Sequence, residues 1–208
     1  MFDRERLRSV DYTLFKTING LSGGSLADSI FKLLANDLAA VLVAAVALTF
    51  LFPWSSKRSQ RRCGAVVATA AAAIGLLVNQ PIAHLVDRTR PYLAHPAHAH
   101  LLITRSHDPS FPSDHATGAF ALALGIWAYD RVIGGVLLAI AAVIAFARVY
   151  VGTHYPGDVV AGAVIAACAV ALLYYARPLR RALEGVARVI GGAWDRVLGR
   201  FGARRALA

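Results

Sequence analysis

Long apolar runs separated by short polar segments dominate the chain. Five runs rich in alanine, valine, leucine and isoleucine cover residues 38–52, 63–83, 116–129, 132–146 and 159–176. A helix that crosses a membrane needs about 20 mostly apolar residues. The first run reaches that length only if its helix starts a turn or more earlier. The pattern predicts an all-α fold, a polytopic membrane helix bundle of five or six spans.

Small residues recur inside these runs. Besides many alanines, the last three runs contain five notable glycines: Gly118, Gly125, Gly134, Gly135 and Gly162. Small side chains let membrane helices pack with their backbones close together. We therefore expect close contacts between helices at these glycines.

Residues 1–36 have a different pattern. Their apolar positions recur at spacings of three and four: Leu7, Val10, Leu14 and Ile18. This spacing predicts an amphipathic helix. Three glycines follow, and Ser25 is expected to cap a second short helix over residues 26–34. We expect this N-terminal interfacial segment to lie at the membrane surface without crossing it.

The tail also has a helical period. Its apolar positions recur at spacings of three and four: Leu179, Leu183, Val186, Ile190, Trp194, Val197 and Phe201. Arginines occupy the other faces, which is typical of a basic amphipathic helix on an anionic membrane surface. The chain is thus predicted to comprise an interfacial segment (1–36), a membrane-embedded domain (37–176) and a basic amphipathic cytoplasmic tail (177–208).

The composition fits a membrane protein. The 208 residues are 57% hydrophobic, the mean hydropathy is +0.54 and the net charge is +10. The basic residues flank apolar runs, and no basic stretch is interleaved with exposed aromatic residues as in single-strand-binding proteins. We therefore expect the bilayer, and no nucleic acid, as the partner of these charges.

The basic residues also predict how the helices are oriented. They concentrate in the loop after the first run, in the turn at Arg131 and in the tail, which contains eight arginines. Cytoplasmic loops of membrane proteins are enriched in lysine and arginine, so these segments are expected on the cytoplasmic side of the cell membrane. Segments 84–115 and 148–158 are then extracytoplasmic. Five spans also place the N-terminus outside, and a further span or re-entrant segment before residue 36 would reverse that.

All seven histidines lie between His84 and His154, in the part of the chain predicted to face outward. Four of them occupy one proline-interrupted loop: His95, His98, His100 and His107. No cysteine or coordinating carboxylate is spaced with them as a zinc site requires. The two cysteines, Cys63 and Cys168, lie inside apolar runs. We interpret the loop as solvated and predict no metal site, no cofactor and no disulfide.

Three polar stretches at the ends of apolar runs carry the candidate chemistry. They cover residues 88–91, 111–115 and 148–158. Ionisable groups at a membrane edge are costly and are functional candidates. Because arginine forks match phosphate oxygens, Arg90 and Arg148 are predicted to bind phosphate, and Arg88 either joins them or pairs with its neighbour Asp87. The hydroxyl of Ser113 and the first N–H groups of the third and fifth spans are expected to add donors.

Two histidines at separate helix ends can divide the work of hydrolysis. Asp158 follows His154 by four residues, and its carboxylate is expected to accept a hydrogen bond from one imidazole nitrogen. The other nitrogen is then free to attack phosphorus. His115 is predicted to protonate the leaving oxygen. These residues predict metal-independent hydrolysis of a lipid phosphate.

The motifs resemble those of the type 2 phosphatidic acid phosphatase (PAP2) superfamily, which includes bacterial vanadium haloperoxidases. The matching residues are Arg90-Pro91, Pro112-Ser113-Asp114-His115, and Arg148 with His154 and Asp158. The resemblance spans residues 26–176. It implies that His154 is the nucleophile and forms a phosphohistidine, that Asp158 orients it and that His115 is the acid. It also implies that the two arginines and the serine of these motifs bind phosphate.

One position departs from the family pattern. The family's first motif usually begins with a lysine seven residues before the arginine, and here that position is Ala83. The phosphate then lacks one cation unless His84 or Arg88 replaces it. In this form the chain is similar to the undecaprenyl-diphosphate phosphatases linked to bacitracin resistance.

This similarity implies hydrolysis of undecaprenyl (polyprenyl) diphosphate to the monophosphate on the extracytoplasmic face. The residues alone predict only a lipid phosphate, so phosphatidic acid and phosphatidylglycerol phosphate are alternative substrates. A transporter that binds lipid phosphate without cleaving it would need charged groups deep in its spans, where this chain is almost wholly apolar. A haloperoxidase is disfavoured because that chemistry usually sits in a soluble helical domain.

Overall fold

The computed structural model describes residues 2–52 and 57–205. Residues 1, 53–56 and 206–208 lie outside the described residues; they belong to the two predicted terminal segments and to the turn after the first apolar run. In the described part every regular element is a helix: α1 Phe2–Asn19, α2 Ser25–Asn36, α3 Leu38–Leu51, α4 Arg58–Val86, α5 Pro91–Ala94, α6 Asp114–Trp127, α7 Arg131–Tyr150, α8 Pro156–Tyr175 and α9 Arg177–Arg205. The predicted all-α class is confirmed.

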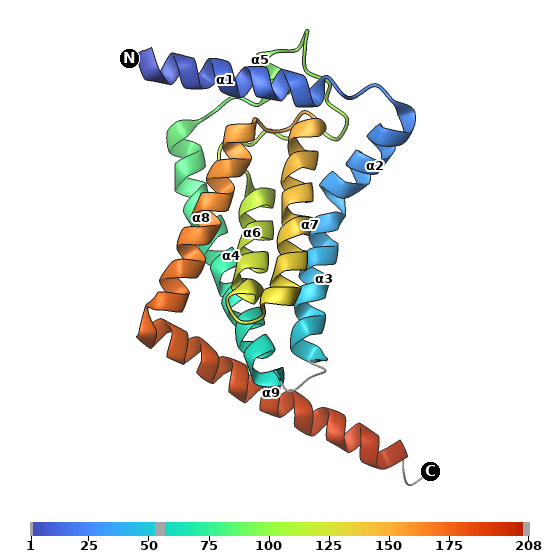
Figure 1. Cartoon of the computed structure of the whole chain (residues 1–208), viewed down its shortest axis with the longest axis vertical. Helices are drawn as coiled ribbons and strands as arrows, with labels where there is room; N and C mark the ends of the chain where they lie inside the picture. Colours follow the sequence, from blue (N-terminus) through green and yellow to red (C-terminus); the bar gives the residue numbers. More distant parts are fainter. Residues whose placement is uncertain (1, 53–56, 206–208) are drawn as a thin grey trace.

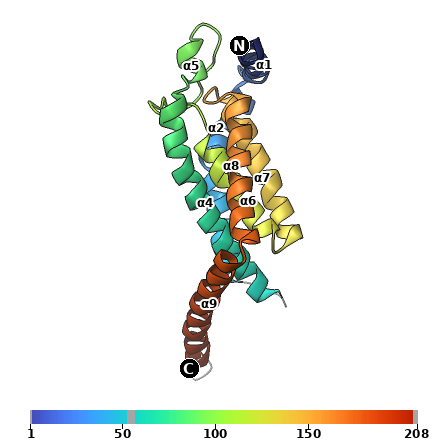
Figure 2. The same ribbon diagram turned by 90° about the vertical axis from the view of Figure 1, so that its left-hand side faces the viewer.

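Five helices form the bundle, namely α3, α4, α6, α7 and α8 (Figures 1 and 2). Helix α6 is central and packs against each of the other four. Its buried side chains, among them Ala119, Leu122 and Ile126, form a shared aliphatic core with α3, α4 and α7. Helix α1 lies across one end of the bundle, and α9 lies at the other end (Figure 1).

Local sequence sets several helix ends. Asp130 begins α7, because its Oδ1 accepts hydrogen bonds from the first N–H groups of that helix, those of Val132 and Ile133. Ser113 caps α6 in the same way. Pro156 occupies the first turn of α8, where a missing N–H costs nothing.

The helix lengths suit a bilayer. Segment Arg58–Ala94, which contains α4, and helices α7 and α8 are long and apolar enough to cross a membrane. Helices α2 and α3 reach that length only as a pair, which is bent by 46°. Among the described residues three helical segments are thus of membrane length, or four if the bent α2–α3 pair is one span, and the 14-residue α6 is not one of them. The bent pair is a broken span or a re-entrant segment, and helix length alone does not reach the predicted five or six spans. Helix α2 also begins at Ser25 itself, with Gly24 as its N-cap.

Three of the five glycines predicted at close contacts lie at such contacts. A Cβ on Gly125 would approach a backbone atom of α4 to 2.3 Å, and one on Gly134 would approach Trp127 to 2.2 Å. Gly162 packs against the start of α6. Gly118 and Gly135 face open space, so the prediction is wrong for these two.

The two ends of the bundle differ in character. Segment 84–115 and the turn between α7 and α8 lie at the end covered by α1 (Figure 1). The starts of α4 and α7 and the arginine-rich α9 lie at the opposite end, where Arg61 bonds Asp130 at 2.9 Å. The histidine-rich loop and the basic segments are therefore separated by the length of the bundle.

Candidate active site

His154 lies in the short turn between α7 and α8 and is only 3% exposed. Its Nδ1 is 2.8 Å from the carbonyl oxygen of Ser110. Because a carbonyl oxygen only accepts hydrogen bonds, Nδ1 carries the proton and Nε2 keeps its lone pair. Nε2 is 3.5 Å from Nη1 of Arg90. The turn therefore presents a neutral imidazole with its unprotonated nitrogen beside a guanidinium.

Asp158 does not make the predicted hydrogen bond to His154. Its Oδ2 is 3.7 Å from Nδ1 of the imidazole, too far for a hydrogen bond. Oδ2 instead accepts from the Ser110 hydroxyl at 2.5 Å and from the Tyr155 N–H at 2.9 Å, and Oδ1 accepts from Arg88 at 2.7 Å. The carboxylate therefore fixes Ser110, and the Ser110 carbonyl fixes the histidine.

Backbone hydrogen bonds join the three predicted polar stretches around this pair. The Ser110 N–H donates to the Arg88 carbonyl at 2.7 Å, and the Ser113 N–H donates to the Asp158 carbonyl at 3.1 Å. Ser110 thus forms hydrogen bonds with the first and third stretches, and it directly precedes the second stretch in the sequence. Sequence reasoning missed it, because one loop serine before the Phe111-Pro112 motif gives no distinguishing signal.

Replacing Ser110 with alanine is expected to lower kcat about tenfold, with little change in KM. The variant keeps the carbonyl that accepts from His154 but removes the hydroxyl that holds Asp158. Steady-state phosphate release measures the effect. Ser9→Ala, on the exposed side of α1, is the matched control. A rise in KM at unchanged kcat would contradict a positioning role.

Two arginines supply positive charge beside His154. Arg90 and Arg148 are each 7% exposed. Arg90 donates to the backbone carbonyls of Asp108 and Thr153. Arg148 donates to the Ala35 carbonyl at 3.4 Å, and its buried Nε has no partner.

Among the described residues, neither of these arginines pairs with a carboxylate. Buried charge is costly without a counter-ion. The pocket they form is therefore built to receive an anion.

His115 and Ser113 lie at the start of α6. The His115 imidazole is partly buried, and Arg148, His154 and Arg90 are charged groups that act on it. The Ser113 Oγ accepts from the N–H of Ala116 at 3.4 Å, which leaves its own hydroxyl hydrogen to donate. Arg90, Arg148 and His115 thus lie within electrostatic reach of His154, and a backbone hydrogen bond from Ser113 to Asp158 joins the start of α6 to this group.

Arg88 and His84 do not join this group as predicted. Arg88 bonds Asp158 at 2.7 Å and Asp11 of α1 at 2.6 Å, so its charge is balanced by two carboxylates. It neither stands free for phosphate nor pairs with its neighbour Asp87. His84 is exposed on the last turn of α4, and within the described residues no hydrogen bond links it to the candidate site.

The start of α8 also differs from the prediction. Its Gly157 N–H donates to Asp11 at 2.7 Å, and the Tyr155 N–H donates to Asp158. Two carboxylates therefore occupy the donors that were expected to face phosphate, and the start of α6 is the remaining helix terminus at the pocket. Asp11 escaped prediction because an acidic residue on an amphipathic surface helix normally faces solvent.

Three of the four loop histidines, His98, His100 and His107, are exposed, as expected for a solvated loop, and His95 is half-buried. The ring of His95 lies against that of Tyr12 of α1, tilted by 32° with 4.0 Å between centroids, and His100 Nδ1 is 2.9 Å from the Ser22 hydroxyl. These two histidines attach the loop to the N-terminal segment. Within the described residues no three His, Cys, Asp or Glu side chains are placed to share a metal ion.

The protein should stay active at a more acidic pH than it would if its nucleophilic histidine had the usual pKa. Burial lowers the pKa of His154 below its usual value of about 6.5, and Arg148 and Arg90 act in the same direction while Asp158 opposes them. The neutral nucleophile therefore persists as pH falls, and the acid limb of kcat/KM that reports His154 should lie below pH 6.5. Asp158→Asn removes the opposing charge, so it should lower the pKa of His154 further and shift the acid limb of kcat/KM to lower pH. An acid limb above pH 6.5 would contradict this assignment.

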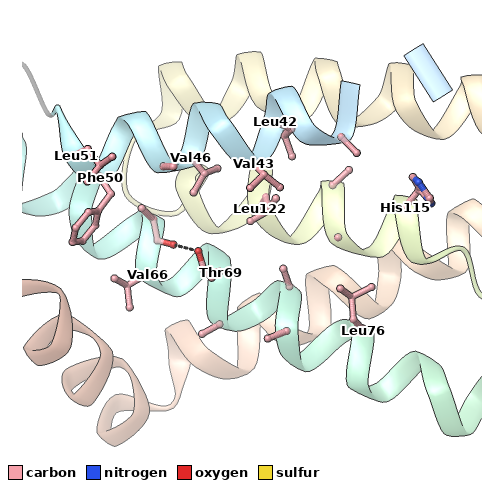
Figure 3. A pocket seen from close by; sticks show the side chains of 18 of the residues that line it. Leu42, Val43, Val46, Phe50, Leu51, Val66, Thr69, Leu76, His115 and Leu122 are labelled. Carbon is pink, nitrogen blue, oxygen red and sulfur yellow. Dashed lines mark hydrogen bonds between the residues drawn. The ribbon is translucent and has the colours of Figure 1, made fainter. Parts of the chain in front are cut away.

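An apolar groove of about 1080 Å³ opens at the site. His115 and Asp114 line one end, and the groove runs between α3, α4 and α6 to α9 (Figure 3). Almost all the remaining lining side chains are aliphatic or aromatic, including Leu42, Val46 and Phe50. His115 thus belongs both to the candidate site and to a groove surface that favours hydrocarbon.

Comparison with known proteins identifies relatives of the chain. Residues 62–182, more than half of its length, match the model of the PAP2 superfamily. Undecaprenyl-diphosphatase BcrC of Bacillus subtilis is 34% identical over 167 residues, which cover 80% of this chain and 83% of that protein.

Two solved structures share the fold. LpxE of Aquifex aeolicus superposes with a TM-score of 0.63 and 26% identity, over 77% of this chain and 92% of that one. The first transmembrane PAP2 type phosphatidylglycerolphosphate phosphatase from Bacillus subtilis superposes with a TM-score of 0.60 over 83% of this chain and 87% of that one. The second structure is 17% identical and bears on the fold alone.

Proposed function

Because this chain belongs to the PAP2 superfamily and is a membrane phosphatase, we propose that it hydrolyses undecaprenyl diphosphate to undecaprenyl monophosphate and phosphate. The observation that carries the proposal is the neutral His154, whose unprotonated Nε2 faces buried arginine charge that no carboxylate of the described residues balances. The groove leading from His115 suits a long hydrocarbon chain. The name of the Bacillus subtilis relative supports the diphosphate as substrate.

The proposed reaction has two steps. His154 Nε2 attacks the terminal phosphorus, and the bond from that phosphorus to the bridging oxygen breaks. His115 gives its proton to the departing monophosphate. Water then attacks the phosphohistidine, His115 takes a proton from that water, and phosphate leaves. Arg90, Arg148 and Ser113 bind the phosphoryl oxygens as charge grows on them.

Each feature of this scheme uses a contact already described. The Ser110 carbonyl stabilises the charged imidazole that forms when His154 is phosphorylated, since Nδ1 keeps its proton. Asp158 balances that charge from 3.7 Å. In this proposal no step needs a metal ion.

Replacing His115 with asparagine should harm poor leaving groups most. We expect kcat to fall about a hundredfold for phosphatidic acid and about tenfold or less for p-nitrophenyl phosphate, because only the alkoxide needs full protonation. Side-by-side turnover on the two compounds measures this ratio. Equal losses on both would remove His115 from the role of acid.

We also propose that the site faces the extracytoplasmic side and that α9 is cytoplasmic. The site and the basic segments lie at opposite ends of the bundle (Figure 1), and basic segments favour the cytoplasm. This arrangement also puts α1 outside, because α1 lies at the same end of the bundle as the site (Figure 1). Labelling of single cysteines at exposed Ser9 and at Val189 of α9 in intact cells tests it.

The substrate is tested with purified protein in detergent that contains EDTA. Undecaprenyl diphosphate and phosphatidic acid are compared at equal concentrations, with His154→Ala as the blank. A clear preference for the diphosphate supports the proposal. Preference for phosphatidic acid would keep the chemistry and overturn the substrate, and activity restored only by added zinc would overturn the metal-free mechanism.

A further inference from the structure

Helix α9 is firmly docked on the bundle. Arg62 of α4 is buried and donates to both carboxylate oxygens of Asp195, each at 2.8 Å. Its Nε also donates to the Phe50 carbonyl of α3 at 3.1 Å. A bidentate arginine–carboxylate pair is a strong and directional contact. One side chain therefore ties α9 to both α3 and α4.

Further contacts fix the position of α9 along its length. A Cβ on Gly191 would lie 2.8 Å from Arg62, so the helix passes directly over the guanidinium. The Trp194 indole donates to the Leu51 carbonyl at 3.1 Å, and the Tyr129 hydroxyl bonds Glu184 at 3.1 Å. The helix predicted as a membrane-surface tail is thus also a packed part of the enzyme.

This docking places two side chains of α9 in the groove. Val186 and Ile190 are four residues apart, so they share one face of the helix, and both line the groove. Each is about half exposed, at 46% and 49%. Val189 faces elsewhere and is 72% exposed. Most of α9 lies beyond the matched family region, which ends at residue 182.

The two ends of the groove are far apart. His115 lies at one end, and Phe50 and Leu51 lie at the other, beside α9 (Figure 3). The lining residues of α3 run from Ala39 to Leu51, which at 1.5 Å per residue corresponds to about 18 Å. A lipid whose phosphate sits at the arginines reaches α9 only if its chain is long.

We propose that Val186 and Ile190 bind the distal part of the substrate's hydrocarbon chain, so that α9 makes the enzyme favour long-chain over short-chain lipid diphosphates. This inference rests on the proposed function. The occupant is assigned because His115, the proposed acid, lines one end of the groove. The Arg62–Asp195 pair holds the two side chains in place.

The test compares kcat/KM for undecaprenyl diphosphate and for the much shorter farnesyl diphosphate. Ile190→Ser should lower kcat/KM for the long substrate about tenfold, since it removes apolar contact at the far end. The value for farnesyl diphosphate should stay within about twofold. Ile190→Leu keeps the contact and should behave like the unmodified protein. Val189→Ser is the matched control on the other face.

Different failures have different meanings. Equal loss on both substrates, or no loss on either, overturns the role of α9. If the unmodified protein cleaves neither diphosphate, the proposed function itself is wrong. Asp195→Asn tests the same role independently. It weakens the Arg62–Asp195 pair that holds α9 in place, so it should reduce the preference for the long-chain substrate while Ile190 itself is unchanged.

Discussion

Replacing His154 with alanine is expected to lower kcat by at least about a thousandfold, equivalent to about 4 kcal/mol of transition-state stabilisation. The variant loses the one nitrogen that can attack phosphorus, while Arg90, Arg148 and Ser113 remain to bind substrate. Binding of the lipid should therefore change little. Phosphate release under saturating substrate measures the loss, and a pull-down with labelled lipid measures the binding that remains.

The nucleophilic role has a direct signature. Substrate labelled in its terminal phosphate should leave label on the unmodified protein after rapid denaturation in base, and no label on His154→Ala. His107→Ala, a change to an exposed histidine of the loop, is the matched control and should keep full activity. Turnover by His154→Ala comparable to the control would rule out covalent catalysis at this residue.

Replacing Arg148 with alanine is expected to lower kcat/KM by about a hundredfold to a thousandfold. Its guanidinium is buried, unpaired with any carboxylate in the described structure, and has an Nε without a partner. Such a group costs stability until an anion arrives. Arg148→Lys keeps the charge but not the planar fork, so it should recover only part of the activity.

Measurements of Tm distinguish an anion-binding role of Arg148 from a structural role. Vanadate or phosphate should raise the Tm of the unmodified protein, because a ligand that binds only the folded state stabilises it, and should not raise that of Arg148→Ala. Without anion, the variant should be at least as stable as the parent. A marked fall in Tm without anion would instead indicate that Arg148 supports the fold.

The sequence predicted the helices and the convergence of the motifs, because both depend on local patterns. Apolar runs define the helices. The motif residues lie at the ends of these helices, so they come close together wherever those helix ends pack side by side. The predicted His154–Asp158 hydrogen bond failed for a physical reason. The two side chains lie only 3.7 Å apart, but the Nδ1 proton goes to the Ser110 carbonyl, while Oδ2 of Asp158 accepts from the Ser110 hydroxyl and the Tyr155 N–H.

Contacts between distant parts of the chain were not predictable. Asp11 reaches Arg88 and Gly157 across 77 and 146 residues, and no periodicity connects them. The same holds for Arg62 and Asp195, which are 133 residues apart. In each case the sequence shows only a charged residue on an amphipathic helix, for which solvent is the ordinary partner.

The hydrogen bond between Asp11 of α1 and the first turn of α8 has a practical consequence for handling the purified protein. Helix α1 lies across the end of the bundle. Its Asp11 forms an ion pair with Arg88, and Arg88 in turn forms an ion pair with Asp158, so the network of hydrogen bonds at Asp158 depends on the position of α1. A harsh detergent that strips α1 from the bundle would disturb this network while the five bundle helices stay packed. Retained helical signal and a monodisperse elution peak would then coexist with an inactive preparation, so activity is the measure by which a solubilising detergent should be chosen.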